Sequence, residues 1–153
     1  MSYIKYNANP KGWKTGDCVV RAIAAATQQP WEDAYNDLCE IGRKKCRMPN
    51  DTQTYAAYLK QKGFTQEKQL RHSNGNWYTI EEVVEAYPHS ILLIHCSHHL
   101  TVAIYGTIID LWNTSYKPAG KFWKLDITED NVSDIMQYLQ FVEENKQSVR
   151  VRL

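Results

Sequence analysis

The spacing of apolar residues in the first part of the chain predicts helices. Residues 1–16 show no periodicity and indicate an extended or looped entry segment. Cys18–Ala26 is rich in alanine, the residue with the highest helix propensity, and Asp17 precedes it as a possible N-cap. From Pro30 onward, apolar residues recur at helical spacing and predict a second helix; they are Trp31, Ala34, Tyr35, Leu38 and Ile41.

Two more helices are predicted by the residues at their ends. Asp51 or Thr52 can cap a third helix, and Gly63 is typical of the position where such a helix stops. Thr79 and Glu82 have the spacing of a capping box, which predicts a short fourth helix before Pro88.

From residue 90 the pattern changes to strands. Three segments rich in β-branched and apolar residues predict an antiparallel meander, with a tight turn at Tyr105-Gly106; they are Ser90–His95, Leu100–Tyr105 and Ile108–Trp112. Lys121–Leu125 adds a further possible strand.

The last part of the chain returns to helical spacing. Residues 129–145 predict an amphipathic helix, and the alternating segment Val149–Leu153 is either an edge strand or a frayed end. Helices first, then an antiparallel sheet, then a C-terminal helix predict an α+β fold, with residues 1–153 as a single domain.

Composition narrows the class of protein. Of 153 residues, 43% are hydrophobic and 23% are charged, which excludes a disordered chain. There are 18 Lys and Arg against 17 Asp and Glu, so no positive excess is present to neutralise phosphates, and we expect no nucleic-acid partner. No apolar run approaches the roughly 20 residues that span a bilayer, so we expect no membrane association. The first residues hold no stretch typical of a signal peptide, so we expect a cytoplasmic location.

The cysteines and histidines do not form a recognisable metal motif. The four cysteines are Cys18, Cys39, Cys46 and Cys96, and no CxxC pair occurs. His98 and His99 are adjacent, so on a strand their side chains point to opposite faces and cannot chelate one ion together. We therefore predict no metal and no cofactor, with a zinc-stabilised interaction domain as a weaker alternative.

Cys18 stands in a position that favours a reactive thiol. Unpaired backbone N–H groups and the helix dipole stabilise a thiolate at the start of a helix. A buried structural cysteine is the alternative interpretation of the same pattern.

Candidate partners for this thiol follow in the predicted hairpin. His99, at the head of one strand, can act as a general base, with His98 as its rival. With a turn near Gly106, residue 99 falls opposite residues 112 to 114, so Asn113 is the nearest residue to orient the imidazole. Asp110 is the alternative third member, because a slip of one residue or a bulge changes which side chain faces His99.

The order and spacing of these residues resemble the papain-like cysteine peptidases, especially small members found in phages and prophages. The matching segments lie between residues 9 and 123; they are Gly16–Ile23, Thr79…Tyr87-Pro88…Ile91-Leu92 and His99-x-x-Val102…Gly106…Asp110-x-Trp112-Asn113. The resemblance implies a papain-like fold with Cys18 as nucleophile, His99 as base and Asn113 as third member.

The resemblance also implies an oxyanion hole, and here the sequence departs from the family. Such enzymes usually carry a Gln shortly before the nucleophile, whereas Gly12 stands six residues before Cys18. The Cys18 backbone N–H can supply one donor, and Asn9 a second if its loop folds back.

The resemblance leads to two functional hypotheses. The first is a thiol protease or amidase, a hydrolase of phage type that forms an acyl-enzyme on Cys18 from a protein or peptide substrate. The second is a catalytically weak or inactive papain-like domain that acts as a protein-binding module.

Overall fold

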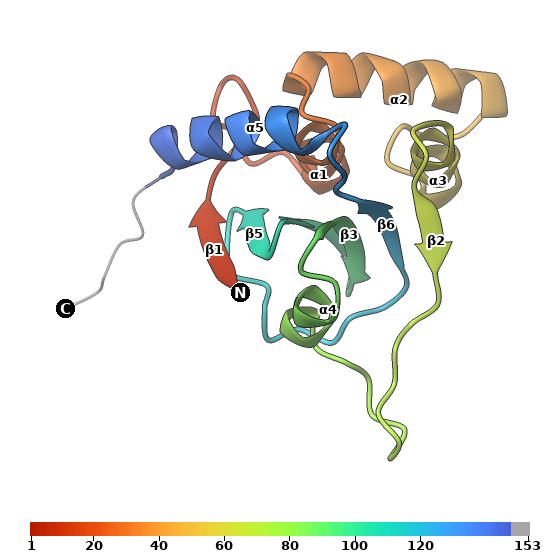
Figure 1. Cartoon of the computed structure of the whole chain (residues 1–153). Coiled ribbons are helices and arrows are strands. Elements are labelled where there is room, and N and C mark those ends of the chain that lie inside the picture. The colour runs from red at the N-terminus through yellow and green to blue at the C-terminus, as the bar shows by residue number, and fades with distance from the viewer. Residues whose placement is uncertain (148–153) are drawn as a thin grey trace.

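A computed structural model describes residues 1–147 and contains five helices and one six-stranded sheet in that part of the chain (Figure 1). The helices are α1 (Cys18–Ala26), α2 (Trp31–Lys45), α3 (Thr52–Gln61), α4 (Ile80–Ala86) and α5 (Val132–Glu144). The strands are β1 (Ser2–Lys5), β2 (Thr65–Glu67), β3 (Ser90–Cys96), β4 (His99–Ile104), β5 (Thr107–Asp110) and β6 (Phe122–Asp126). The predicted α+β class is confirmed. The possible strand at Val149–Leu153 lies outside the described residues.

The sheet is mixed, whereas the sequence predicted an antiparallel one. Its strand order is β1-β5-β4-β3-β6-β2. The meander β3–β4–β5 and the β6 and β2 pairings are antiparallel, as expected for β3 to β6, but β1 runs parallel to β5. A parallel pair needs a long crossover between its strands, and here the whole segment from α1 to β4 separates β1 from β5. The entry segment therefore contributes an edge strand that no local sequence pattern predicted.

Side-chain alternation along the strands creates an apolar core on each face of the sheet. In β3, Ile91 and Leu93 pack on the face covered by α1, α2, α3 and α5, while Leu92 and Ile94 pack against α4 on the opposite face. Figure 1 shows α1 and α5 on one side of the sheet and α4 on the other. Because β3 is buried on both faces, its sequence is a continuous apolar run rather than an alternating one.

Several predicted turns and caps are confirmed in atomic detail. The Asp51 carboxylate accepts a bond from the Gln53 N–H at 2.8 Å, which caps α3. Thr79 and Glu82 form both bonds of the capping box at the start of α4. Tyr105 and Gly106 both have positive φ, at 52° and 79°, as the tight turn between β4 and β5 requires.

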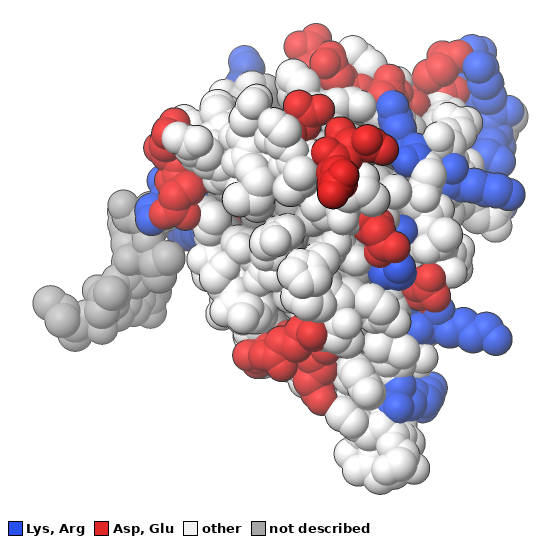
Figure 2. Space-filling view, viewed as in Figure 1, with Lys and Arg blue, Asp and Glu red and all other residues white. Residues whose placement is uncertain are grey.

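Figure 2 shows most Lys and Arg side chains along the right side of the visible face, with uncharged residues over much of its centre. Basic residues gather at the end of α2, where Arg43, Lys44 and Lys45 form the last turn, and Glu40 pairs with two of them. Positive charge at this position complements the negative end of the helix dipole. Among residues 1–147, no helix has both the length and the apolar character needed to cross a membrane.

Candidate active site

Cys18 is the first residue of α1, and its thiol is half-buried where α1 meets the start of β4. The Asp17 carbonyl accepts the first bond of the helix from the Arg21 N–H, at 2.9 Å. The N–H groups of Cys18, Val19 and Val20 precede that bond, so they carry the positive end of the helix dipole. The local structure thus gives Cys18 the helix-start position that the sequence predicted.

His99 is the side chain that meets Cys18. Its imidazole is close enough to the thiol that each group shifts the pKa of the other. The Nε2 atom lies 2.7 Å from Asp110 Oδ2, which leaves Nδ1 for Cys18. The His99 side chain is 13% exposed and that of Asp110 is 2% exposed, so this hydrogen bond is shielded from solvent. The rival residue, His98, is exposed in the turn between β3 and β4 and has a φ of 54°.

Asp110 is fixed by several donors besides His99. Its Oδ2 atom also accepts from the Thr101 hydroxyl at 2.7 Å. Its Oδ1 atom accepts from the Leu111 N–H at 2.7 Å and from Arg21 Nη1 at 3.3 Å. A buried carboxylate with this many donors is held in a single orientation.

Asp110, rather than Asn113, is therefore the residue that the structure places at the His99 imidazole. Val102 pairs with Ile109, and continuing this register sets Thr101 opposite Asp110 and His99 opposite position 112. Residues 110 and 112 point to the same side as His99, whereas residue 113 has the opposite parity. Asn113 is exposed, and its Oδ1 accepts from the Ser115 N–H at 3.1 Å. Asn113 is the nearest residue by register counting, but its parity directs its side chain away from the face that carries His99. The expectation that Asn113 orients the imidazole is therefore wrong.

Asp17 occupies the N-cap position of α1, but its carboxylate makes no capping bond to the helix. It accepts instead from Arg21 Nε at 2.9 Å, from Trp31 Nε1 at 2.9 Å and from Asn9 Nδ2 at 3.2 Å. The predicted side-chain cap at Asp17 is therefore wrong, because the carboxylate accepts from the Arg21 guanidinium and the Trp31 indole N–H instead of from the helix backbone. The loop before Cys18 does fold back, and Asn9 lies beside the start of α1 with one amide N–H committed to Asp17.

The electrostatic environment separates Cys18 from the other buried thiol. Burial alone raises the pKa of Cys18, but the hydrogen bonds from His99 and the Leu100 N–H, with the charges of His99 and Arg21, bring it below the ordinary value. Burial lowers the pKa of His99, yet the bonds to Asp110 and Cys18 outweigh it and raise that pKa to about 9. Burial raises the pKa of Cys96 to about 11. The pKa values of Cys18 and His99 are therefore shifted in the directions that favour a thiolate–imidazolium pair, whereas the pKa of Cys96 is shifted in the direction that favours the neutral thiol.

Three residues of this site were absent from the sequence-based expectation. Thr101 and Trp31 gave no signal, since a threonine in a strand and a tryptophan on a helix are both common. Arg21 did give one: it is the single charged residue in the buried segment Cys18–Ala26. A lone cation in such a helix predicts a buried anionic partner.

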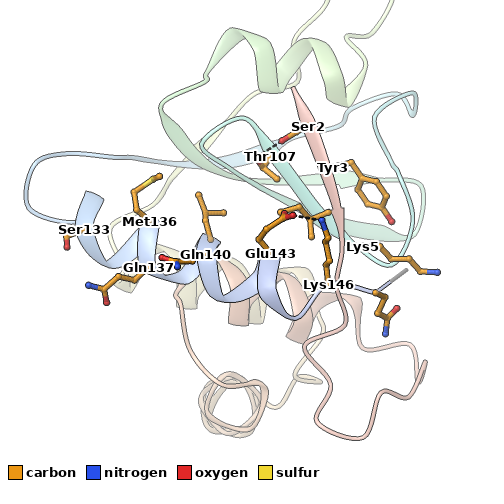
Figure 3. A pocket seen from close by; sticks show the side chains of 13 residues that line it. Ser2, Tyr3, Lys5, Thr107, Ser133, Met136, Gln137, Gln140, Glu143 and Lys146 are labelled. Atoms are coloured by element: carbon orange, nitrogen blue, oxygen red, sulfur yellow. Dashed lines mark hydrogen bonds and ion pairs between the residues drawn. The ribbon is translucent and has the colours of Figure 1, made fainter. Parts of the chain in front are cut away.

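Other places in the described residues do not share these features. Within residues 1–147, no three His, Cys, Asp or Glu side chains are placed to hold a metal ion. A groove of about 900 Å³ lies between β1 and α5, and Figure 3 shows residues such as Ser2, Thr107, Met136 and Gln140 along its walls. Its lining does not include Cys18, His99 or Asp110, so the groove is separate from the thiol.

Comparison with known proteins yields no match to a family model, to a curated protein or to a solved structure.

Proposed function

We propose that this chain is a papain-like cysteine hydrolase that cleaves a peptide or amide bond in a protein or peptide substrate. The observation that carries the proposal is the alignment of three groups. The Cys18 thiol at a helix start faces the His99 imidazole, whose far nitrogen is 2.7 Å from the buried Asp110 carboxylate. Nucleophile, base and orienting group in this order are the elements of acyl transfer.

The first half of the reaction forms an acyl-enzyme. The Cys18 thiolate attacks the carbonyl carbon of the substrate, and the carbonyl oxygen takes the negative charge. The Cys18 backbone N–H, at the positive end of α1, is positioned to donate to that oxygen. The C–N bond then breaks as the His99 imidazolium gives its proton to the leaving amine, and a thioester remains on Cys18.

The second half returns the enzyme to its starting state. Neutral His99 takes a proton from water, whose oxygen attacks the thioester carbonyl. The C–S bond breaks, a carboxylic acid leaves, and the thiolate–imidazolium pair is restored. Asp110 keeps Nε2 protonated and the ring oriented in both halves without itself taking up a proton. The sum is amide plus water giving acid plus amine.

A second candidate function has one observation in its favour. Position 12, six residues before Cys18, is a glycine, and the nearby Asn9 amide already donates to Asp17 at 3.2 Å. A side-chain donor for the oxyanion is therefore not evident in this loop. A domain with the fold but a weak oxyanion hole would serve as a protein-binding module, and the proposed phage origin and cytoplasmic location fit either function.

Cleavage of a complex peptide mixture tests the proposal. A proteome-derived peptide library is incubated with the wild-type protein and with the Cys18→Ala and Cys39→Ala variants, and new termini are counted by mass spectrometry. We expect new termini with the wild type and Cys39→Ala but not with Cys18→Ala. Equal counts for the wild type and Cys18→Ala would reject peptide hydrolysis and favour the binding module.

A further inference from the structure

A buried arginine joins the start of α1 to the end of β5. Arg21, the fourth residue of α1, donates from Nε to Asp17 Oδ1 at 2.9 Å and from Nη1 to Asp110 Oδ1 at 3.3 Å. Its side chain is 12% exposed, and the two carboxylates are 5% and 2% exposed. One guanidinium therefore links the residue before Cys18 to the residue that binds His99.

The two carboxylates need this cation. An ionised carboxylate inside a protein is unstable unless a positive group faces it, and otherwise it takes up a proton. Asp17 has Arg21 as its cationic partner, with Asn9 and Trp31 as neutral donors. Without Arg21, Asp17 would be left with the neutral donors Asn9 and Trp31, and Asp110 with His99 as its cationic partner. Each carboxylate would lose a charged contact, including the carboxylate that binds His99.

Arg21 also sets the orientation of the Asp110 carboxylate. Arg21 and the Leu111 N–H both bind Oδ1, which leaves Oδ2 for His99 and Thr101. With Arg21 removed, the carboxylate loses a charged contact on the side that faces away from His99. From these contacts we infer that Arg21 is a positioning residue that acts on the Cys18–His99 pair through Asp110. The inference rests on the proposed function and gives a role to a residue for which the papain-like resemblance implies none.

Other titratable groups face this cluster from the surrounding elements. Burial raises the pKa of Tyr3 and the Asp110 charge adds to this rise, while burial also raises the pKa of Tyr55 and Cys18 adds to that rise. Burial, with the charges of Lys121, His98 and His99, lowers the pKa of His95, and burial raises that of Cys96, on which Asp110, Lys117 and Cys18 also act. Tyr3, Tyr55 and Cys96 are neutral between pH 5 and 8. The charge balance of the cluster in that range is therefore set by Asp17, Cys18, Arg21, His99 and Asp110, with His95, Lys117 and Lys121 nearby.

Lysine and methionine at position 21 separate charge from geometry. Lysine keeps the positive charge but is a point donor, and it cannot reproduce a fork that reaches two carboxylates from different nitrogens. Methionine removes both the charge and the fork at similar length. If Arg21 acted only as a nearby positive charge, the Arg21→Lys variant would keep the wild-type reactivity of the Cys18 thiol. If Arg21 positions Asp110, the Arg21→Lys variant would lose most of that reactivity, as Arg21→Met does.

The readout is the rate of Cys18 alkylation by iodoacetamide in the folded protein, from pH 5 to 9, measured for each cysteine by mass spectrometry. We expect Arg21→Met and Arg21→Lys each to slow Cys18 at pH 6 by about tenfold or more, since a tenfold loss of thiolate corresponds to one unit of pKa. Arg43→Met is the matched control: Arg43 pairs with Glu40 on the exposed face of α2, and its loss leaves the Cys18 rate unchanged. In the Asp110→Ala background, Arg21→Lys should slow Cys18 no further.

Three outcomes would overturn the inference. One is a wild-type alkylation profile in both folded Arg21 variants, and another is full recovery in Arg21→Lys. The third is failure of Arg21→Lys to fold, judged by thermal unfolding, which would assign Arg21 to the fold alone. If Cys18 of the wild-type protein alkylates like an ordinary thiol, the proposed function fails first, so the two failures are distinguishable.

Discussion

The Nε2 atom of His99 lies 2.7 Å from the Oδ2 atom of Asp110, although the two residues are diagonal rather than opposite in the β4–β5 pair. Diagonal neighbours on one face of a sheet are within reach when one side chain is long. Thr101 stands opposite Asp110 and donates to the same oxygen at 2.7 Å. The carboxylate is therefore shared between a histidine and the threonine two residues along the same strand.

Asp110, and not Asn113, should control the reactivity of Cys18. We expect Asp110→Ala to slow amide hydrolysis by about a hundredfold or more, because loss of the orienting carboxylate in a serine triad costs about 10⁴ in turnover. Asp110→Asn should slow hydrolysis at least as much, since an amide carries no charge and its NH₂ group can hold the imidazole in the wrong tautomer. Turnover of one cleaved library peptide measures both.

Asn113→Ala is the control for that comparison. It removes the acceptor of the Ser115 N–H, which costs about 1 kcal/mol of unfolding free energy, and leaves the hydrolysis rate within about twofold. A loss of turnover in Asn113→Ala as large as that in Asp110→Ala would contradict the assignment of Asp110.

His99 should remain protonated well above the pH at which an ordinary histidine titrates. An NMR titration that follows the imidazole signals should give a pKa of about 9, against an ordinary 6.5. Because the folded-state pKa is the higher one, the stabilisation from this proton is complete below about pH 6.5 and declines as the pH rises through about 9. Urea unfolding from pH 6 to 10 should show this decline, and an imidazole that titrates near 6.5 in the folded protein would refute it.

Gly42 should not tolerate alanine, although it lies inside α2. A Cβ at this position would stand 2.6 Å from the Arg47 carbonyl oxygen, because the chain folds back after the helix through Cys46, with a φ of 56°. Alanine normally stabilises a helix by up to about 1 kcal/mol relative to glycine, but here we expect a loss of about 1–3 kcal/mol. Chemical denaturation measures the change.

Asn36→Ala is the matched control on the exposed face of the same helix. It should change the unfolding free energy by less than about 1 kcal/mol, and in the stabilising direction, because alanine has the higher helix propensity. A Gly42→Ala variant as stable as Asn36→Ala would show that the turn after α2 yields without strain.

Much of the fold follows from local sequence signals. The capping box at Thr79 and Glu82, the turn at Tyr105-Gly106 and the apolar strand β3 are all encoded within a few residues, and the structure contains each of them. The two edge strands are different. Strand β1 has four residues and β2 has three, and both are held by partners more than fifty positions away. Such short strands carry too few residues for an alternating pattern to be visible.

The sequence predicts the candidate nucleophile and base of the site, but not the residues that bind and orient the base. A cysteine after a helix start and a histidine at the head of a strand are positions that a sequence can reveal, and Cys18 and His99 do meet. The choice between Asp110 and Asn113 depended on the parity of a strand whose end could not be located to within one residue. Arg21 lies four residues after Asp17, the N-cap residue of α1, but its further contact with Asp110 depends on how α1 packs on the sheet. That packing is a tertiary property.

The pH dependence of Cys18 alkylation in the wild-type protein tests the central claim most directly. Iodoacetamide is applied to the folded protein from pH 5 to 9, and each cysteine is quantified by mass spectrometry. We predict that Cys18 reacts fastest and stays reactive well below the ordinary thiol pKa of about 8.5, while Cys96 reacts only when the protein is unfolded. His99→Ala should remove the advantage of Cys18. A Cys18 that is inert, or that titrates like a free thiol, would contradict the thiolate–imidazolium pair on which the proposed function depends.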